Sequence, residues 1–481
     1  MTNCLLEAAS IRKNKISLTD YNYQRDIENR LLMSCFSDRD LEVLEEILYS
    51  SIQIPLEKLA KNLDLSKETL MPTLEKLSQT GLLTLSEDKV FVDKDMRKYF
   101  EVQIEKFSED FTPGMDFLQG LLKKPPIHVL PIWYSIPRTS NNIFDSLVEK
   151  YLQTPQIFQR YILELNLGEP ILKNIIQDVY SAPGFEITSD DLMDKYQISR
   201  EIFEEYMLHL EFSFVCCLGY KKKGEVWIEI VTPFHEWREY LRFLETTETK
   251  KIADPSKVQL KRPSEFSFVQ DLALILDQTQ KKPLTLIATQ DSLCFSPESK
   301  KQLIPLFPGS NIDENINDTY LNTLLFKLTV LRLANAISGE LHITEAGLEW
   351  LGMRLDSQAL YLYRHPKNEI QSYDFTPENY SEKALKEAEK SICRVLHKDW
   401  VFYDEFQKGI IAPLRDEHAI CLKKVGRNWA YTVPNYTEQD AKFIQATVLQ
   451  RLFEAGLVQV GTLEGRDCFR VTSLGQTLFA K

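Results

Sequence analysis

The side chains that most often catalyse reactions or bind metals are scattered along this sequence. All seven histidines stand singly, and a lone histidine is more often a core or surface residue than a ligand or a base. Neither H-E-x-x-H nor C-x-x-C occurs, so the common zinc patterns are missing. Cys216 and Cys217 are adjacent, and neighbours on a strand point to opposite faces, which disfavours joint metal binding. We therefore expect no metal site and no catalytic residue.

Nucleotide-dependent chemistry also lacks its usual sequence. The chain contains neither the G-x-x-x-x-G-K-[ST] loop nor the G-x-G-x-x-G turn that cradles phosphates. Carboxylates give no guidance, because among 70 acidic residues some pair always resembles a catalytic one. The sequence predicts a non-enzymatic protein without a cofactor, and the alternative is a hydrolase or transferase activity that no motif reveals.

Clusters of basic residues suggest a different chemistry, the binding of phosphates. Lysine and arginine side chains supply most of the affinity of proteins for nucleic acid. Lys221, Lys222 and Lys223 precede a glycine at an expected hairpin tip, and a second cluster comprises Lys423, Lys424 and Arg427. These six residues are the candidates for nucleic-acid contact, and the alternative is that they are solvated turns.

Acidic residues oppose that interpretation. The chain carries a net charge of −13 at pH 7, so it has no long-range attraction to a polyanion. The helix expected from Arg200 to about Leu210 contains Glu201, Glu204 and Glu205, which would repel phosphates and attract a basic protein surface. We treat these carboxylates, with Tyr361 and Tyr363 of an expected linker, as candidates for protein contact.

The elements that carry these side chains follow a signature written four times. Each copy has an apolar helix end of the form L-x-x-L-x-x-x-G-L, two short strands around a polar turn, and a Thr or Asp that starts a helix. Gly81 and Gly456 follow the helix in the first and fourth copies, whereas Phe214 and Arg332 stand there in the second and third. Such self-similarity predicts a string of related small domains.

The first copy indicates what each domain is. Apolar residues between positions 41 and 48 lie on one face of a helix, and Ser66 is a suitable cap for a later helix. Gly81 suits a left-handed helix end, and residues 82–92 read as a hairpin. Three helices followed by a hairpin make a winged helix, which is a helix-turn-helix with a β-wing.

The fourth copy adds two features of its own. Thr437, with Asp440 three residues later, resembles a capping box at the start of a helix. An inserted segment that contains Trp429 and Tyr431 precedes it. The third copy is expected to carry an insertion at residues 284–307.

We therefore predict a mainly α fold with small β-hairpins (α+β), a tandem array of about four winged helix-turn-helix units joined by helical spacers. An extension at 1–37 precedes winged helix 1 at 38–100, and a spacer at 101–167 leads to winged helix 2 at 168–244. After a linker at 245–265, winged helix 3 covers 266–353. A linker at 354–382 leads to winged helix 4 at 383–481.

The ends of the third and fourth copies carry a family resemblance. Residues 341–351 and 469–478 both read as a strand, T-x-x-G and a helix, at Thr344 and Gly347 and at Thr472 and Gly475. This ending resembles bacterial tandem winged-helix proteins of the class that bears an XPB-type helicase-associated domain. The resemblance covers roughly the second half of the chain and implies an accessory or regulatory role near nucleic-acid transactions. It implies no helicase motor, because the phosphate loop is missing.

Composition places the protein in a cell compartment. No run of 18 apolar residues exists that would span a membrane, and the first ten residues lack the pattern of a signal peptide. Eight cysteines without regular spacing favour a reducing compartment, so we expect a cytoplasmic protein. We interpret it as an accessory factor in transcription, replication or repair that binds a protein partner, with direct and salt-dependent DNA contact as one route. The alternative is an adapter subunit without DNA contact.

Overall fold

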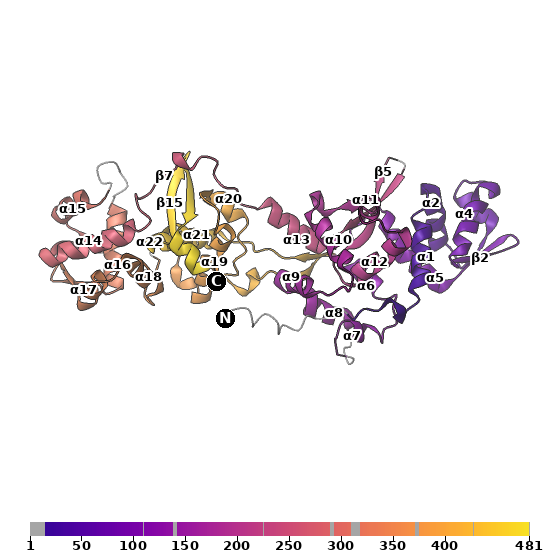
Figure 1. Ribbon diagram of the computed structural model, residues 1–481, viewed down its shortest axis with the longest axis horizontal. Helices are drawn as coiled ribbons and strands as arrows, with labels where there is room; N and C mark the ends of the chain where they lie inside the picture. The colour runs from indigo at the N-terminus through magenta and orange to yellow at the C-terminus, as the bar shows by residue number, and fades with distance from the viewer. Residues whose placement is uncertain are drawn as a thin grey trace. The chain divides into compact units, whose positions relative to one another are not determined.

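The computed structural model describes residues 15–108, 110–137, 142–224, 226–288, 293–308, 318–370, 375–426 and 428–480 (Figure 1). Helices dominate and the strands form small antiparallel sheets, so the expected α+β class is confirmed at this level. Contacts divide the chain into two compact units: Met1–Arg242 with Cys421–Thr432, and Phe243–Ile420 with Val433–Lys481. We call them the N-terminal unit and the C-terminal unit.

The first copy, in the N-terminal unit, alternates helices with short strands. It comprises α2 (Asp38–Tyr49), β1 (Gln53–Pro55), α3 (Leu56–Asn62), α4 (Lys67–Gln79), β2 (Leu83–Ser86), β3 (Lys89–Val92) and α5 (Lys94–Ile104). The strand order is β1-β3-β2. The Ser66 hydroxyl accepts a hydrogen bond from the Thr69 N–H at 3.2 Å, which confirms the expected cap of α4.

The second copy repeats this order in the same unit. Its elements are α10 (Pro170–Ser181), β4 (Ile187–Thr188), α11 (Ser189–Tyr196), α12 (Arg200–Phe212), β5 (Cys217–Lys223), β6 (Val226–Thr232) and α13 (His235–Thr246). Ser199 accepts a hydrogen bond from the Ile202 N–H and so caps α12. Thr232, by contrast, donates to the Pro233 carbonyl and lies three residues before α13, so it does not start that helix.

The third copy, in the C-terminal unit, contains the expected insertion. Its elements are α14 (Ser267–Lys281), β8 (Leu284–Ala288), β9 (Leu293–Phe295), α15 (Pro297–Leu303), α16 (Asp318–Val330), β10 (Ala334–Ile337), β11 (Glu340–Ile343) and α17 (Glu345–Leu351). β8 pairs with β11 as β1 pairs with β3, and β9 adds an edge strand to β8.

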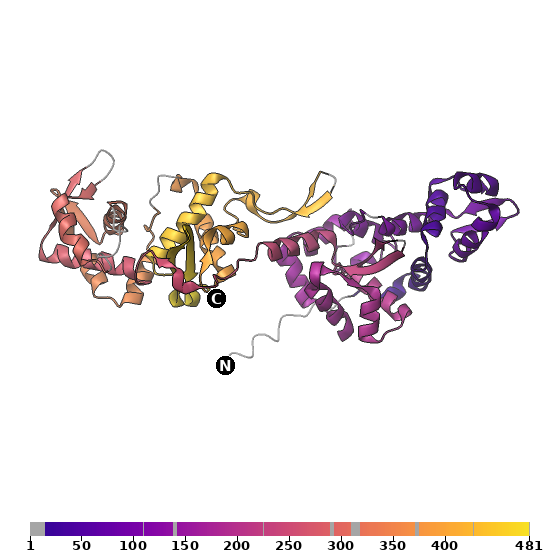
Figure 2. The same cartoon turned by 90° about the horizontal axis from the view of Figure 1, so that it is seen from above.

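The fourth copy contains α19 (Glu382–Lys390), β12 (Val401–Phe402), α20 (Tyr403–Lys408), α21 (Glu438–Ala446), α22 (Leu452–Glu454), β15 (Val458–Leu463), β16 (Arg466–Val471) and α23 (Ser473–Phe479). A π-helical turn, Thr447–Arg451, joins α21 to α22. Thr437 and Asp440 form the expected capping box. The inserted segment is the hairpin of β13 (Leu422–Val425) and β14 (Asn428–Tyr431) (Figure 2), which belongs to the N-terminal unit.

One pairing recurs in all four copies within the described residues. The short strand between the first two helices runs antiparallel to the last strand of the hairpin, in the pairs β1–β3, β4–β6, β8–β11 and β12–β16. Each three-helix group is therefore closed by a small sheet.

The position after the third helix has the same backbone conformation in every copy. The φ angles are +74° at Gly81, +64° at Phe214, +58° at Arg332 and +67° at Gly456. Only glycine adopts this left-handed region without strain. The alignment of the two degenerate copies with the two glycine-bearing copies is thus confirmed at the backbone, although their side chains differ.

The threonine of the T-x-x-G ending closes each C-terminal copy on itself. The Thr344 hydroxyl accepts the Gly347 N–H at 3.0 Å and donates to the Leu333 carbonyl at 3.0 Å. Thr472 does the same with Gly475, at 3.1 Å, and with the Gly456 carbonyl, at 2.7 Å. One hydroxyl thus caps a helix and holds it against the preceding helix end.

The expected spacers are helical, and one expected linker is partly helical as well. α6 (Met115–Leu121), α7 (Leu130–Trp133), α8 (Ile143–Leu147) and α9 (Pro155–Glu164) fill the 101–167 spacer. α1 (Tyr23–Met33) lies in the N-terminal extension, and α18 (Leu355–Arg364) occupies part of the 354–382 linker. The short strand β7 (Gln259–Leu260) of the 245–265 linker pairs with β15. In the C-terminal unit a single cluster of buried residues extends from Phe268 to Val471, so the third and fourth copies share one core.

Candidate interaction surfaces

The first basic cluster lies where the sequence predicts it, at the end of the β5–β6 hairpin. Lys221, Lys222 and Lys223 are all exposed. Lys221 forms an ion pair with Glu186, and the Lys222 ammonium lies 3.1 Å from a carboxylate oxygen of Asp38. Two of the three positive charges are therefore compensated within the fold, which leaves Lys223 to act on a ligand.

The carboxylate of Asp38 also holds the hairpin in place. Its other oxygen accepts a hydrogen bond from the Trp227 indole N–H at 2.6 Å. Hydrogen bonds from Lys222 and Trp227 lower the pKa of Asp38. Because Asp38 begins α2 and Trp227 lies on β6, this contact joins the first and second copies.

The second basic cluster lies on the β13–β14 hairpin. Lys423 and Lys424 are exposed on β13, and Arg427 lies outside the described residues. The base of this hairpin is fixed to the N-terminal unit, because the Leu422 N–H donates to the Gln153 carbonyl and the Tyr431 hydroxyl to the Leu152 carbonyl, both at 2.8 Å. The hairpin is thus fixed at its base, and its two lysines make no ion pair among the described residues.

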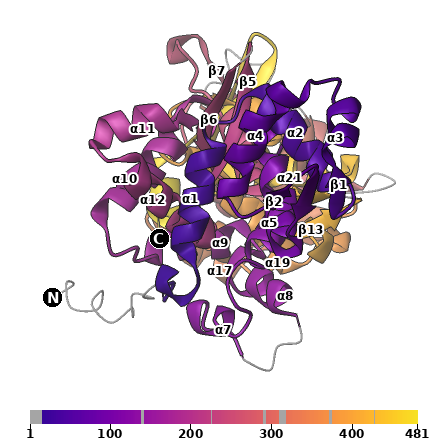
Figure 3. The same ribbon diagram turned by 90° about the vertical axis from the view of Figure 1, so that its right-hand side faces the viewer.

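Glu204 does not lie where the sequence analysis places it. It is fully buried, at 0% exposure, and its carboxylate is held by Arg30 at 2.7 Å and by Arg200 at 2.6 Å. The expectation that it contacts a protein partner is corrected, since both oxygens are used inside the fold. The reason is helix α1, which lies beside α12 (Figure 3) and belongs to a segment that the repeat does not include. Arg30 is on this helix and pairs with Glu204.

The pair of Arg30 and Glu204 belongs to a larger buried network. Arg30 also contacts Glu211 at 2.8 Å, and Lys106 lies 3.3 Å from the same carboxylate. Burial alone would raise the pKa of Glu211, but Arg30 and Lys106 outweigh it and hold that pKa below its ordinary value. This balance keeps the carboxylate ionised in the interior, where an unpaired charge would be very costly.

The other two candidate carboxylates lie on the outer side of α12. Glu201 is exposed and Glu205 is half-buried. Ile202, between them in sequence, is 43% exposed, and Tyr206 is half-buried. The acidic character that the sequence predicts for this surface therefore rests on two carboxylates rather than three.

The tyrosines expected in a linker lie on helix α18 instead. Tyr361 and Tyr363 are half-buried and pack against the core of the C-terminal unit. The Tyr363 hydroxyl donates to Glu389 at 2.7 Å, and Glu389 is also held by Arg451 at 2.7 Å. The expectation of exposed contact residues is corrected, because their aromatic rings pack against the core.

Third helices of the C-terminal unit are occupied by internal contacts as well. Lys327 of α16 is fully buried, 2.9 Å from Glu454, and donates to the Asn368 side chain at 2.7 Å. Arg451, after α21, is buried with Glu389. Lys327 and Arg451 are therefore committed to the interior, whereas Lys442 of α21 stays partly exposed and pairs with Glu438 at 2.8 Å.

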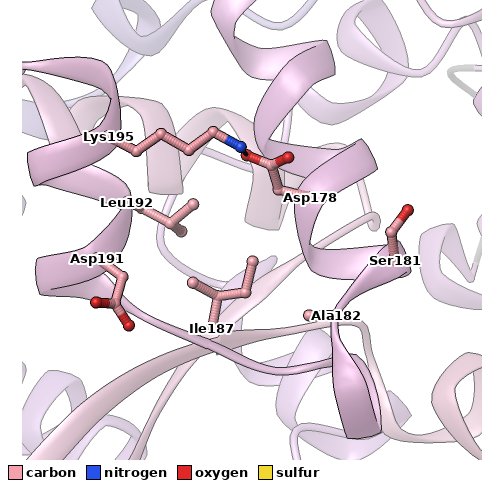
Figure 4. A pocket seen from close by; sticks show the side chains of 7 residues that line it. All are labelled: Asp178, Ser181, Ala182, Ile187, Asp191, Leu192 and Lys195. Atoms are coloured by element: carbon pink, nitrogen blue, oxygen red, sulfur yellow. Dashed lines mark hydrogen bonds and ion pairs between the residues drawn. The ribbon is translucent and has the colours of Figure 1, made fainter.

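A cavity of about 390 Å³ opens in the second copy between α10, β4 and α11 (Figure 4). Its lining residues are Asp178, Ser181, Ala182, Ile187, Asp191, Leu192 and Lys195. Lys195 and Asp178 pair across it at 2.5 Å. Asp178 therefore neutralises Lys195, and the second carboxylate of the lining, Asp191, accepts a hydrogen bond from the Thr188 hydroxyl.

The described residues contain no cluster of three or more His, Cys, Asp or Glu side chains able to hold a metal ion. In this part of the chain, no helix is both long and apolar enough to cross a membrane. No protein-family model matches the chain. The curated proteins contain no match to it either.

Proposed function

We propose that this chain is a tandem array of four winged helices, at about residues 38–100, 168–244, 266–353 and 383–481, that acts as a non-enzymatic adapter between proteins. The assignment of the units is supported by the recurring order of helices and strands, the recurring strand pairing and the shared left-handed residue. Glu201 and Glu205 offer protein contact, and the role implied by the resemblance is that of an accessory factor in nucleic-acid transactions.

The observation that carries the adapter function is the burial of charged side chains on, or directly after, three of the third helices. A winged helix that reads DNA lays its third helix in the major groove and needs basic side chains there. In the second, third and fourth copies, three charged residues are buried in ion pairs: Glu204 of α12, Lys327 of α16, and Arg451 in the π-helical turn after α21. A helix whose side chains are committed to its own fold has few left for base edges.

The second candidate function, direct contact with nucleic acid, is favoured by the β13–β14 hairpin. Its exposed Lys423 and Lys424 form no ion pair among the described residues, in contrast to Lys221 and Lys222. Two lysines neutralise few phosphates, so this contact would be weak and independent of sequence.

Binding of the full chain to a labelled DNA duplex, followed by fluorescence anisotropy at increasing salt, tests the choice between these functions. The adapter function predicts weak binding at low salt that disappears near physiological salt. Tight binding at physiological salt, with photo-crosslinks from α4, α12, α16 or α21 to bases, would contradict it.

A further inference from the structure

We propose that the outer face of α12 docks a basic, amphipathic helix of a partner protein. This inference rests on the adapter function and names the chemistry of one partner. The docking face consists of Glu201, Ile202, Glu205, Tyr206 and His209.

Helix periodicity places these five residues on one stripe. Positions 201, 205 and 209 are one turn apart, as are 202 and 206, so each row lies along the helix axis. The opposite side is filled by Phe203, Glu204, Met207 and Leu210, all at 0% exposure. Burial of that side leaves a single accessible stripe on α12.

The stripe combines an apolar row with an acidic row. Ile202 is 43% exposed and Tyr206 is half-buried beside it, so an apolar row faces outward. Glu201 and Glu205 form an acidic row along its edge, and Glu169 adds a third charge near the Tyr206 hydroxyl. Arg200, the basic residue of this helix, is turned to Glu204 and Glu229 and does not neutralise them.

Charge and shape together define the partner. Lysines or arginines one helical turn apart would face Glu201 and Glu205, while an apolar residue of the same helix would cover Ile202 and Tyr206. Nucleic acid does not fit this face, because its phosphates would meet the carboxylates with like charge.

A synthetic amphipathic peptide of lysine and leucine, labelled for anisotropy and carrying a photo-crosslinker, is the probe. Full-length protein should bind it and crosslink within α12, and a twin peptide with glutamate for lysine should not bind. The double variant Glu201→Lys/Glu205→Lys should weaken binding about tenfold or more, and Ile202→Ser should weaken it at high salt as well.

The matched control is Glu68→Lys/Glu75→Lys on the third helix α4 of the first copy, where both residues are exposed. It makes the same change of net charge, so it should leave peptide affinity within about twofold. Equal weakening by the control, or crosslinks outside α12, would overturn the docking face. Absence of peptide binding would overturn the docking face but not the adapter function. Tight binding to a DNA duplex at physiological salt would overturn the adapter function, so the two failures are distinguishable.

Discussion

At the scale of single residues, the left-handed position after the third helix is occupied by glycine in two copies and by a strained non-glycine residue in the other two. Arg332 holds a φ of +58° and its side chain is exposed. A non-glycine residue in this region costs about 1–2 kcal/mol, which a glycine avoids.

Arg332→Gly should therefore raise the free energy of unfolding by about 0.5–1 kcal/mol, after the larger entropy loss of glycine is subtracted. Urea titration of the full chain measures it. Arg364→Gly, in the last turn of α18, is the control and should lower the free energy by about 1 kcal/mol. Destabilisation by Arg332→Gly would show that its side chain stabilises the fold.

The glycine of the T-x-x-G ending has a steric role. A Cβ at Gly475 would lie 2.3 Å from the Leu457 carbonyl oxygen, and one at Gly347 would lie 2.1 Å from that of Leu333. Since these are backbone atoms, the helix itself must move to admit a side chain.

Gly475→Ala should lower the free energy of unfolding by about 1–3 kcal/mol, through overpacking. Gly352→Ala provides the comparison, because its Cβ would meet the nearest atom at an ordinary 3.4 Å and its φ is −76°. Thermal melts that show equal effects at the two glycines would refute the steric explanation.

At the scale of elements, α12 shows two neighbouring glutamates with different roles. Glu204 is held by Arg30 and Arg200, whereas Glu205 lies on the docking face. Removing one partner from a buried ion pair leaves an uncompensated charge, which typically costs about 3–5 kcal/mol.

Glu204→Gln should thus destabilise the N-terminal unit by about 3–5 kcal/mol, and Glu205→Gln should change stability by about 0.5 kcal/mol or less. Proteolysis under native conditions and urea titration would report both. Similar losses at the two positions would mean that α12 is not divided into a buried and an accessible side.

A second element, α13, places a carboxylate at the start of α6. The Glu236 side chain accepts the Met115 N–H at 2.9 Å and is only 4% exposed. Burial raises the pKa of Glu236 from 4.5 to about 7. The native state therefore binds a proton that the unfolded state releases, so this group's stabilisation is lost as the pH rises from about 4.5 to 7.

The variant Glu236→Gln stays neutral, so it should match the parent near pH 4 and exceed its stability by up to about 3 kcal/mol at pH 8. Urea titrations across this range measure the difference. Glu239→Gln, on the same helix but half exposed, should show no such trend. If the parent became more stable relative to Glu236→Gln between pH 5 and pH 8, the raised pKa of Glu236 would be contradicted.

The sequence predicted local elements better than it predicted the contacts between elements that are distant in the chain. The caps at Ser66 and Thr437 and the left-handed residue Gly81 could be predicted because each depends on contacts a few residues apart. The pairing of Arg30 with Glu204 joins residues separated by 174 positions, and no periodicity predicts it. The repeat pattern predicts Glu204 at the surface because it does not include α1, the helix that carries Arg30.

At the scale of the whole molecule, two compact units contain four copies. The third and fourth copies share one core and the buried pairs of Lys327 with Glu454 and of Arg451 with Glu389. A boundary drawn at residues 354–382 therefore separates sequence copies but crosses a continuous interior, because α18 packs into that core. The sequence pattern defines the four copies, whereas the shared core determines which of them are expected to unfold together.

The net charge of −13 sets the terms of any contact with nucleic acid. The acidic protein repels phosphates at long range, so binding depends on local positive charge. On the β13–β14 hairpin two exposed lysines have no described counter-ion. If each lysine neutralises one phosphate, the logarithm of the binding constant should fall with the logarithm of the salt concentration with a slope of about −2.

Lys423→Glu/Lys424→Glu should therefore abolish low-salt binding to a labelled duplex, because the change removes both contacts and adds two repulsive charges. Lys94→Glu/Lys98→Glu, at exposed positions of α5, alters the net charge equally and should leave a measurable slope. Equal loss in both variants would assign the binding to net charge rather than to the hairpin. A slope much steeper than about −2 in the parent would require further phosphate contacts, for which Lys223 at the end of the β5–β6 hairpin is an exposed candidate.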